Sequence, residues 1–203
     1  MPASLSVVAS TVEADAGAAP GPAPGALRKL SHTDERLCAC VRAHLAAVWR
    51  VLRRSGVPAA DADDAAQKVF LVLSQKLKDV PQGRELSFLL RTAVLVASVT
   101  RRTQRRRREV SDPSPEERPS SMPTPEREVL QREALCQLDT ILNEMDESLR
   151  VVFVLYEIEE MTMAAIAETL EIRQGTVASR LRRARERFEA LAVGVRADGG
   201  GGQ

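Results

Sequence analysis

The chain has 203 residues and a formal net charge of +1, enough for one ordinary domain or two small ones. Hydrophobic residues make up 44% of it and aromatic residues only 3%, so its cores must be built from Leu, Val, Ile and Ala, as in helix bundles. No basic segment followed by an apolar run resembles a secretory signal, and no apolar stretch is long enough to span a bilayer. We therefore expect an all-α cytoplasmic protein with no membrane insertion.

The first part of the chain divides into a low-complexity segment and a helical block. Residues 1–30 are rich in Ala, Pro, Gly and Ser, and we expect them to be disordered because they cannot bury enough apolar surface to offset the lost conformational entropy. Residues 31–108 carry apolar side chains at spacings of three and four, which predicts one small helical domain. Its predicted helices span about 33–55, 59–77 and 84–108, with Gly56 and Pro58 separating the first two.

A proline-dense acidic segment, 109–128, separates this block from a second one. Neither a helix nor a sheet tolerates that density of proline, so we predict a flexible linker between two small domains. Residues 129–192 predict the second helical domain, and the glycine-rich end, 193–203, predicts a disordered tail. The predicted helices of this domain span 130–143, 147–159, 163–170 and 175–192, with Asp146 and Thr162 as the N-caps of the second and third.

The small net charge conceals a segregation of charges along the chain. Arginines crowd residues 101–108 and 180–187, while acidic residues collect in 109–128 and 139–160. Because a basic block acts on a partner within about 8 Å in physiological salt, two such blocks predict two contacts with nucleic acid. Two solvated helix faces are the alternative, and for 101–108 alone the two interpretations are evenly matched.

The most informative segment is 162–187. A short helix with an apolar inner face is followed by a tight turn and by a second helix with Val177, Leu181 and Ala184 on one side, which is typical of a helix-turn-helix. The opposite side of the second helix carries residue types that reach base edges and phosphates in a major groove. The predicted DNA-binding residues are Arg173, Gln174, Gly175, Thr176, Ser179, Arg180, Arg182 and Arg183.

The run from Gly175 to Glu186 (GTVASRLRRARE) resembles the recognition helix of extracytoplasmic-function sigma factors of the sigma-70 family. Residues 149–155 and 166–170 are similar to the same family's region four, which binds the upstream, minus thirty-five promoter element. The resemblance implies that function for the second domain. At Glu171 the family often has a turn glycine, and a glutamate there costs about 1 kcal/mol if the turn requires a positive φ.

Residues 61–70 are similar to the family's region-two helix, which docks on RNA polymerase. Polar residues at spacings of three and four share one face of this helix, and Phe70 is the expected inner anchor. A solvated helix surface is the alternative for the same pattern. The polymerase-binding residues implied by the resemblance are Asp61, Asp64, Gln67, Lys68 and Phe70.

In the family, a promoter-melting segment and a basic helix follow the docking helix, and the loop corresponding to Asp79–Leu86 captures a flipped base. Leu95 and Val99 replace an asparagine and an aspartate of the family, whose polar groups would hydrogen-bond to unstacked bases. These departures keep open a sigma-like protein that holds polymerase without opening promoters. The implied contacts to the downstream, minus-ten element are Phe88, Arg91, Arg101, Arg102, Arg105 and Arg106.

The sequence predicts no catalysis, no cofactor and no metal. His32 and His44 are the only histidines, neither has a triad-like setting, and no phosphate-cradling glycine loop or dinucleotide fingerprint occurs. His32, Cys38, Cys40 and His44 could together suggest zinc, but Cys38 would point away from the helix face that Cys40 and His44 share. Reduced, partly buried cysteines are therefore the favoured interpretation.

These features predict a sigma factor that binds core RNA polymerase and promoter DNA at the nucleoid. The resemblance implies a further regulatory partner, such as an anti-sigma protein. A stand-alone helix-turn-helix regulator that binds DNA without polymerase is an alternative, against which the resemblance of the first domain to a polymerase-docking domain argues.

Overall fold

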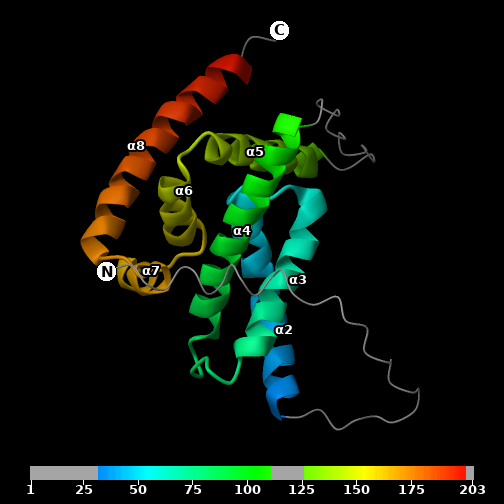
Figure 1. Ribbon diagram of the computed structural model, residues 1–203. Helices are drawn as coiled ribbons and strands as arrows, with labels where there is room; N and C mark the ends of the chain where they lie inside the picture. Colours follow the sequence, from blue (N-terminus) through cyan, green and yellow to red (C-terminus); the bar gives the residue numbers. More distant parts are fainter. Residues whose placement is uncertain (1–31, 111–125, 200–203) are drawn as a thin grey trace. The chain divides into compact units, whose positions relative to one another are not determined.

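The structure, a computed structural model, describes residues 32–110 and 126–199 (Figure 1). Within these ranges the chain forms helices joined by turns and contains no β-strand, so the predicted all-α fold is confirmed. The predicted disordered segment 1–30 and the central part of the predicted linker lie outside the described residues.

Three helices make up what we call the first block, residues 32–110. Each packs against the other two, because each carries one apolar stripe at helical spacing (Figure 1). Leu52, Leu73 and Leu89, one from each helix, are fully buried where the stripes meet. The helices are α2 (His32–Arg54), α3 (Ala59–Lys76) and α4 (Glu85–Val110).

The second block, residues 126–199, is built around its last helix. That helix contacts α5, α6 and α7, and it buries Val177 and Ala184 against Val152 and Ile166 of the preceding helices. The elements are α5 (Glu126–Asn143), α6 (Glu147–Phe153), the π-helical turn η1 (Val154–Ile158), α7 (Met163–Leu170) and α8 (Gln174–Gly199).

The ends of four helices differ from the predicted boundaries. The helix expected over 147–159 is α-helical only to Phe153 and continues as a π-helical turn. α8 continues to Gly199, so much of the tail expected to be disordered is helical, and α4 and α5 reach into both ends of the expected linker. Extending an existing helix through Arg-, Glu- and Ala-rich sequence fixes one residue per added hydrogen bond, which is far cheaper than starting a helix.

Contacts also join the two blocks, so that the described residues form one compact unit. α2 contacts α5 and η1, and α4 contacts α7. At the α2–α3 turn, Gly56 adopts a φ of +91° and lies against Arg150 and Asn143 of the second block. A β-carbon at Gly56 would come within 2.7 Å of the guanidinium of Arg150. The turn between the first two helices is therefore part of the contact between the blocks.

Both predicted N-caps of the second block are confirmed. The carboxylate of Asp146 accepts hydrogen bonds from the backbone N–H of Ser148 at 2.9 Å and from its hydroxyl at 2.7 Å. The hydroxyl of Thr162 accepts one from the backbone N–H of Ala165 at 3.2 Å. These bonds satisfy N–H groups that have no partner within the helix.

Replacing Asp146 with alanine should lower the free energy of unfolding by about 1 kcal/mol at neutral pH. Hydrogen bonds from Ser148 hold the pKa of Asp146 below its ordinary value. The stabilisation is therefore present above the unfolded pKa of about 3.9 and is lost as the pH falls through the folded pKa. Urea titrations at several pH values measure this. Asp146→Asn keeps the acceptor and should retain its stability in acid; an equal loss in both variants would contradict the capping role.

Candidate nucleic-acid and polymerase interfaces

The helix-turn-helix predicted at 162–187 is present as α7, a tight turn and α8. Val177 and Ala184 on the inner face of α8 are fully buried, Leu181 is nearly so, and Ile172 in the turn is half-buried against the same core. The inner face therefore fixes how α8 lies, and the opposite face is left to solvent. Of the predicted DNA-binding residues, Thr176 and Arg180 are half-buried, and the exposed ones are Arg173, Gln174, Gly175, Ser179, Arg182 and Arg183.

Further arginines continue this exposed face toward the end of α8. Arg182 donates a hydrogen bond to Glu186 one turn later, at 2.6 Å. Arg185, which was not among the predicted DNA-binding residues, donates to Glu157 at 2.7 Å and lies over the ring of Tyr156 at 5.3 Å. Arg185 therefore ties α8 to η1. Its role was missed because the pairing depends on the π-helical turn, which no sequence pattern predicts.

The turn between α7 and α8 does require a left-handed residue, and that residue is Glu171. Its φ of 54° and ψ of 42° fall in the αL region, and its N–H donates to the carbonyls of Ala167 and Glu168 as a helix C-cap. A side chain with a β-carbon in this region costs about 1–2 kcal/mol relative to glycine. The carboxylate of Glu171 accepts a hydrogen bond from Arg91 on α4, which holds the pKa of Glu171 below its ordinary value.

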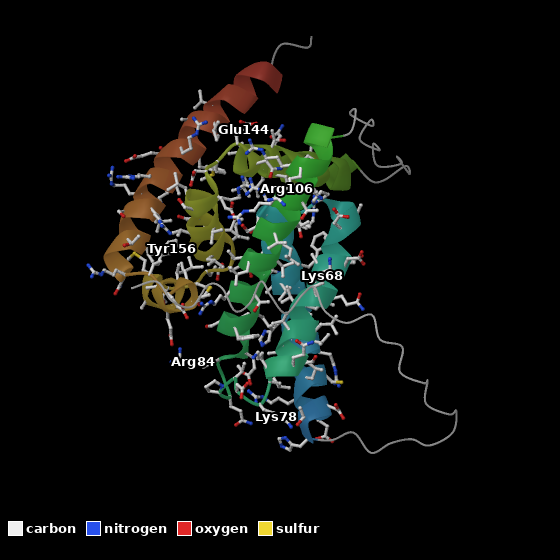
Figure 2. All side chains as sticks on the ribbon, viewed as in Figure 1. Lys68, Lys78, Arg84, Arg106, Glu144 and Tyr156 are labelled. Atoms are coloured by element: carbon white, nitrogen blue, oxygen red, sulfur yellow. The ribbon has the colours of Figure 1, made fainter. Side chains whose placement is uncertain are left out.

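The predicted polymerase-binding residues lie on α3 and divide between its surface and its core. Asp64, Gln67 and Lys68 are exposed; Lys68 is labelled in Figure 2. Asp61 is half-buried and accepts a hydrogen bond from Gln104 of α4. Phe70 is only 9% exposed and belongs to the core, so it anchors the helix and does not lie on its surface.

Leu71 is the apolar side chain that the sequence reasoning missed on this face. It is 52% exposed and lies seven residues after Asp64 and four after Gln67, on the same side of α3. The sequence reasoning placed it neither in the buried stripe nor among the polymerase-binding residues. The helical period alone places it with the polar residues. We call Asp64, Gln67, Lys68 and Leu71 the α3 face.

The predicted downstream-DNA residues lie along α4 and fall into an exposed group and a half-buried group. Arg102, Arg105 and Arg106 are exposed at its end, where Figure 2 labels Arg106. Phe88, Arg91 and Arg101 are half-buried. Arg91 pairs with Glu171, and Arg101 lies 3.8 Å from Glu147. Leu95 is half-buried and Val99 is 57% exposed, so the aliphatic side chain of Val99 faces solvent.

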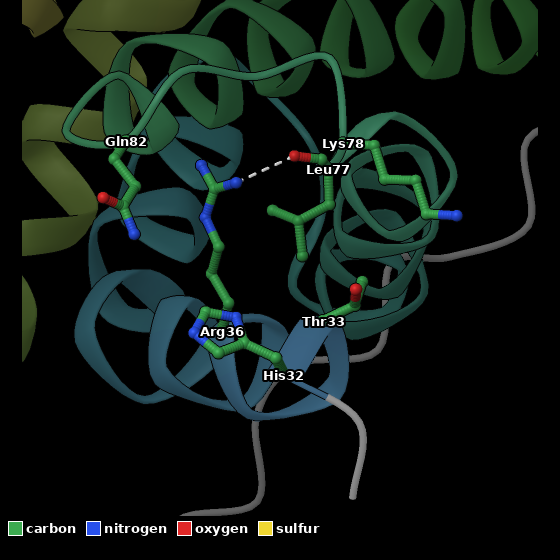
Figure 3. A pocket seen from close by; sticks show the side chains of 6 residues that line it. All are labelled: His32, Thr33, Arg36, Leu77, Lys78 and Gln82. Atoms are coloured by element: carbon green, nitrogen blue, oxygen red, sulfur yellow. Dashed lines mark hydrogen bonds between the residues drawn. The ribbon is translucent and has the colours of Figure 1, made fainter.

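The loop between α3 and α4 is held in place by Arg36 of α2, beside a cavity of about 300 Å³ (Figure 3). The Arg36 guanidinium donates to the carbonyls of Leu77 at 3.0 Å and Val80 at 2.7 Å. It also donates to the carboxylate of Glu85, at 2.6 Å for the shorter bond. Burial raises the pKa of Glu85, but the hydrogen bonds that the carboxylate accepts, first from Arg36, lower it overall. Sequence reasoning missed Arg36 because its partners lie 41 to 49 residues away.

The cysteines and histidines considered for zinc do not converge in the part of the chain that the structure describes, where no group of three or more His, Cys, Asp or Glu residues could hold a metal. Cys40 lies in the core and Cys38 is half-buried. Burial raises the pKa of the Cys40 thiol, which favours its protonated form. None of the helices in the described ranges has the length and apolar character needed to cross a membrane.

Known proteins similar to this chain point to one family. The family description "Sigma-70, region 4" matches residues 136–188, which contain the helix-turn-helix. The chain is 30% identical over 159 residues to RNA polymerase sigma factor NccH of Alcaligenes xylosoxydans xylosoxydans, covering 74% of this chain and 83% of that protein. It is 28% identical over 149 residues to ECF RNA polymerase sigma factor SigE of Mycolicibacterium smegmatis, covering 73% of this chain and 58% of SigE.

Solved structures share the fold. CnrH in complex with the cytosolic domain of CnrY matches with a TM-score of 0.59 and 23% identity, over 77% of this chain and 87% of that one. The sigma factor RpoE in complex with the anti-sigma factor NepR from Bartonella quintana matches with a TM-score of 0.61 and 17% identity, over 77% and 96%. With the helix-turn-helix geometry, these findings show that the chain belongs to the extracytoplasmic-function group of the sigma-70 family of RNA polymerase sigma factors.

Proposed function

We propose that this sigma factor binds core RNA polymerase through the α3 face and directs it to promoters through α8 and α4. The observation that carries the proposal is α8, which is packed on one side and presents an exposed basic side within the segment matched to sigma-70 region 4. Recognition of this kind uses binding energy alone and needs no catalytic group in the chain. The protein then acts at the nucleoid.

The experiment that tests the proposal is to mix the protein with core polymerase lacking any sigma factor and to look for a complex by gel filtration. A complex that supports run-off transcription from cognate promoters would establish the function. A complex without transcription would favour a sigma-like protein that does not open promoters, a possibility motivated by the aliphatic Leu95 and Val99. Specific DNA binding without any complex would favour a stand-alone regulator.

Replacing Leu71 with alanine should weaken the polymerase complex about tenfold, because the exposed half of this apolar side chain would be removed from water in the complex. The free energy of unfolding should change little, since Leu71 is half exposed in the free protein. A fluorescence titration against core polymerase measures the affinity. Val99→Ala, which trims another exposed apolar residue on a different helix, is the matched control. Equal effects of both variants would contradict the assignment of the α3 face.

Replacing Arg180 with alanine should weaken binding to promoter DNA that carries the upstream element. The expected loss is about 1–3 kcal/mol if Arg180 reads a base, or a salt-dependence slope lower by about one if it contacts a phosphate. Holoenzyme binding measured over a range of salt concentrations distinguishes the two. Arg187→Ala, on the same helix two turns later, is the control, and unchanged affinity for Arg180→Ala would contradict the groove assignment.

An anti-sigma protein is the regulatory partner that we propose. Two structural relatives were solved with a bound protein, the cytosolic domain of CnrY for CnrH and the anti-sigma factor NepR for RpoE. Co-purification of the tagged full chain, followed by inhibition of run-off transcription by the recovered protein, tests this.

A further inference from the structure

The ion pairs that join the two blocks share one polarity. In each such pair among the side chains that the structure describes, the arginine belongs to the first block and the carboxylate to the second, although both blocks contain residues of both signs. Asp139 forms ion pairs with two arginines. In the two pairs that involve α7 or the turn after it, every side chain is about one-third exposed or more. The pairs are Arg50–Glu159, Arg53–Asp139, Arg54–Asp139, Arg84–Glu168, Arg91–Glu171 and Arg101–Glu147.

Two of these arginines, Arg91 and Arg101, are among the five expected to contact downstream DNA. Arg91 and Arg101 are paired to carboxylates here, and Arg84, seven residues before Arg91, pairs with Glu168 on α7. A guanidinium binds a carboxylate and a phosphate through the same planar set of donors. The carboxylates of the second block therefore occupy the groups that a DNA backbone would use.

Glu171 gives a second, independent sign that this contact is a built feature. The turn after α7 would be relaxed with glycine, yet Glu171 holds the αL conformation and places its carboxylate on Arg91. An unfavourable backbone conformation persists only where the surroundings compensate for it. The hydrogen bond to Arg91 adds to the two capping hydrogen bonds that the Glu171 N–H makes in this conformation.

The upstream-reading side of α8 takes no part in this contact. Arg173, Gln174 and Ser179 stay exposed while Arg91 is paired. In the same conformation, therefore, the upstream-reading surface is open, and the part of the downstream surface formed by Arg91 and Arg101 is engaged within the chain.

We propose that Arg84, Arg91 and Arg101 form an anion-binding surface that the second block's own carboxylates occupy in the free protein and DNA phosphates occupy on a promoter. The free chain then presents the upstream-reading helix and withholds Arg91 and Arg101, while Arg102, Arg105 and Arg106 at the end of α4 stay exposed. The phosphate half of this inference rests on the proposed function; the closed conformation does not.

The full chain can report its own opening through two dyes, one on each block. Exposed Gln75 of α3 and Glu189 of α8 are replaced by labelled cysteines, with Cys38 and Cys136 changed to serine. Energy transfer should be high for the parent protein in low salt. It should fall as salt rises to about 1 M, where charges are screened beyond about 3 Å.

The Glu171→Gly variant distinguishes an effect on the contact between the blocks from an effect on the stability of the fold. It removes the carboxylate from Arg91 and relaxes the backbone, so the closed-to-open ratio should fall about threefold while the thermal midpoint holds or rises. Glu160→Gly is the matched control, because Glu160 also has a positive φ, 53°, and is exposed, but no ion pair joins it to any described side chain of the first block. That variant should stay closed. Opening by both variants, or by neither, would overturn the proposal.

Charge reversal supplies the decisive result. Glu168→Arg with Glu171→Arg should open the chain about tenfold, and adding Arg84→Glu with Arg91→Glu should close it again. Adding a short DNA duplex at constant ionic strength should open the parent chain. It should not open the variant that carries all four charge reversals. Failure of the reversal to restore closure refutes the ion-pair mechanism. Normal closure and reversal in a chain that binds neither polymerase nor DNA would refute the proposed function alone.

Discussion

Replacing Arg150 with methionine should lower the free energy of unfolding by about 3 kcal/mol or more, the largest loss that we expect from a single polar side chain. The Arg150 side chain is fully buried, and burial lowers its pKa to about 10, so it remains charged at neutral pH. In the described part of the chain no carboxylate forms an ion pair with it. Its stabilising partners are backbone carbonyls and one amide.

Those partners lie at the ends of two helices. The guanidinium donates to the carbonyl of Asn143 at 3.1 Å and to that of Met145 at 2.9 Å, after α5. It also donates to the carbonyl of Ser55 at 3.2 Å, just after α2. Helix C-termini carry partial negative charge, so one cation stabilises both. Its removal leaves buried carbonyls unsatisfied, at about 1–3 kcal/mol for each group.

Urea denaturation of Arg150→Met measures the loss, with Arg150→Lys as the control. Lysine keeps the charge but not the planar set of donors that reaches separate carbonyls, so an intermediate loss is expected. A loss below about 1 kcal/mol in the methionine variant would contradict the capping role, because removal of even one buried partner should cost that much.

Replacing Gly56 with alanine should destabilise the protein clearly more than replacing Gly83 with alanine. Both glycines have a positive φ, +91° and +82°, so both substitutions carry a similar backbone cost of about 1 kcal/mol. A β-carbon at Gly83 meets nothing within 4 Å, whereas one at Gly56 comes within 2.7 Å of the Arg150 guanidinium and 2.8 Å of the Asn143 amide oxygen. The guanidinium cannot move without losing its hydrogen bonds.

The difference in free energy of unfolding between the Gly56→Ala and Gly83→Ala variants isolates the contact between the blocks. We expect this difference to be about 2 kcal/mol, a typical cost of inserting a carbon into a packed site. It should largely vanish when the two glycine substitutions are made in the Arg150→Met background. Thermal denaturation of the four proteins measures this coupling. Equal losses for the two glycines would show that the α2–α3 turn does not press against the second block.

The local parts of this structure could be predicted from the sequence. The apolar period located the helices, and short-range chemistry identified the caps at Asp146 and Thr162. The inner face of α8 was also confirmed, because Val177, Leu181 and Ala184 recur at helical spacing over a short stretch. These features depend on residues fewer than about ten positions apart, where the geometry of a helix fixes which side chains meet.

The long-range parts could not be predicted. Ser55 and Arg150 are 95 positions apart, and Arg91 and Glu171 are 80 apart, and no period relates residues of either pair. Phe70 was expected both to anchor α3 and to bind polymerase; its burial in the core fits the first role, and the second stays a prediction. The neighbouring Leu71 is a different case, because the helical period alone places it on the exposed side of α3 and the sequence reasoning overlooked it.

The division of α8 into a packed side and an open side has an evolutionary consequence. A β-carbon built on Gly175 meets nothing within 4 Å, and the neighbouring outward residues contribute nothing to the core. Mutations on that side can therefore accumulate without destabilising the fold. Duplicated copies of such a gene could drift toward different promoters while keeping the same scaffold, and the same freedom makes this helix suitable for redirecting the protein to a chosen DNA sequence by design.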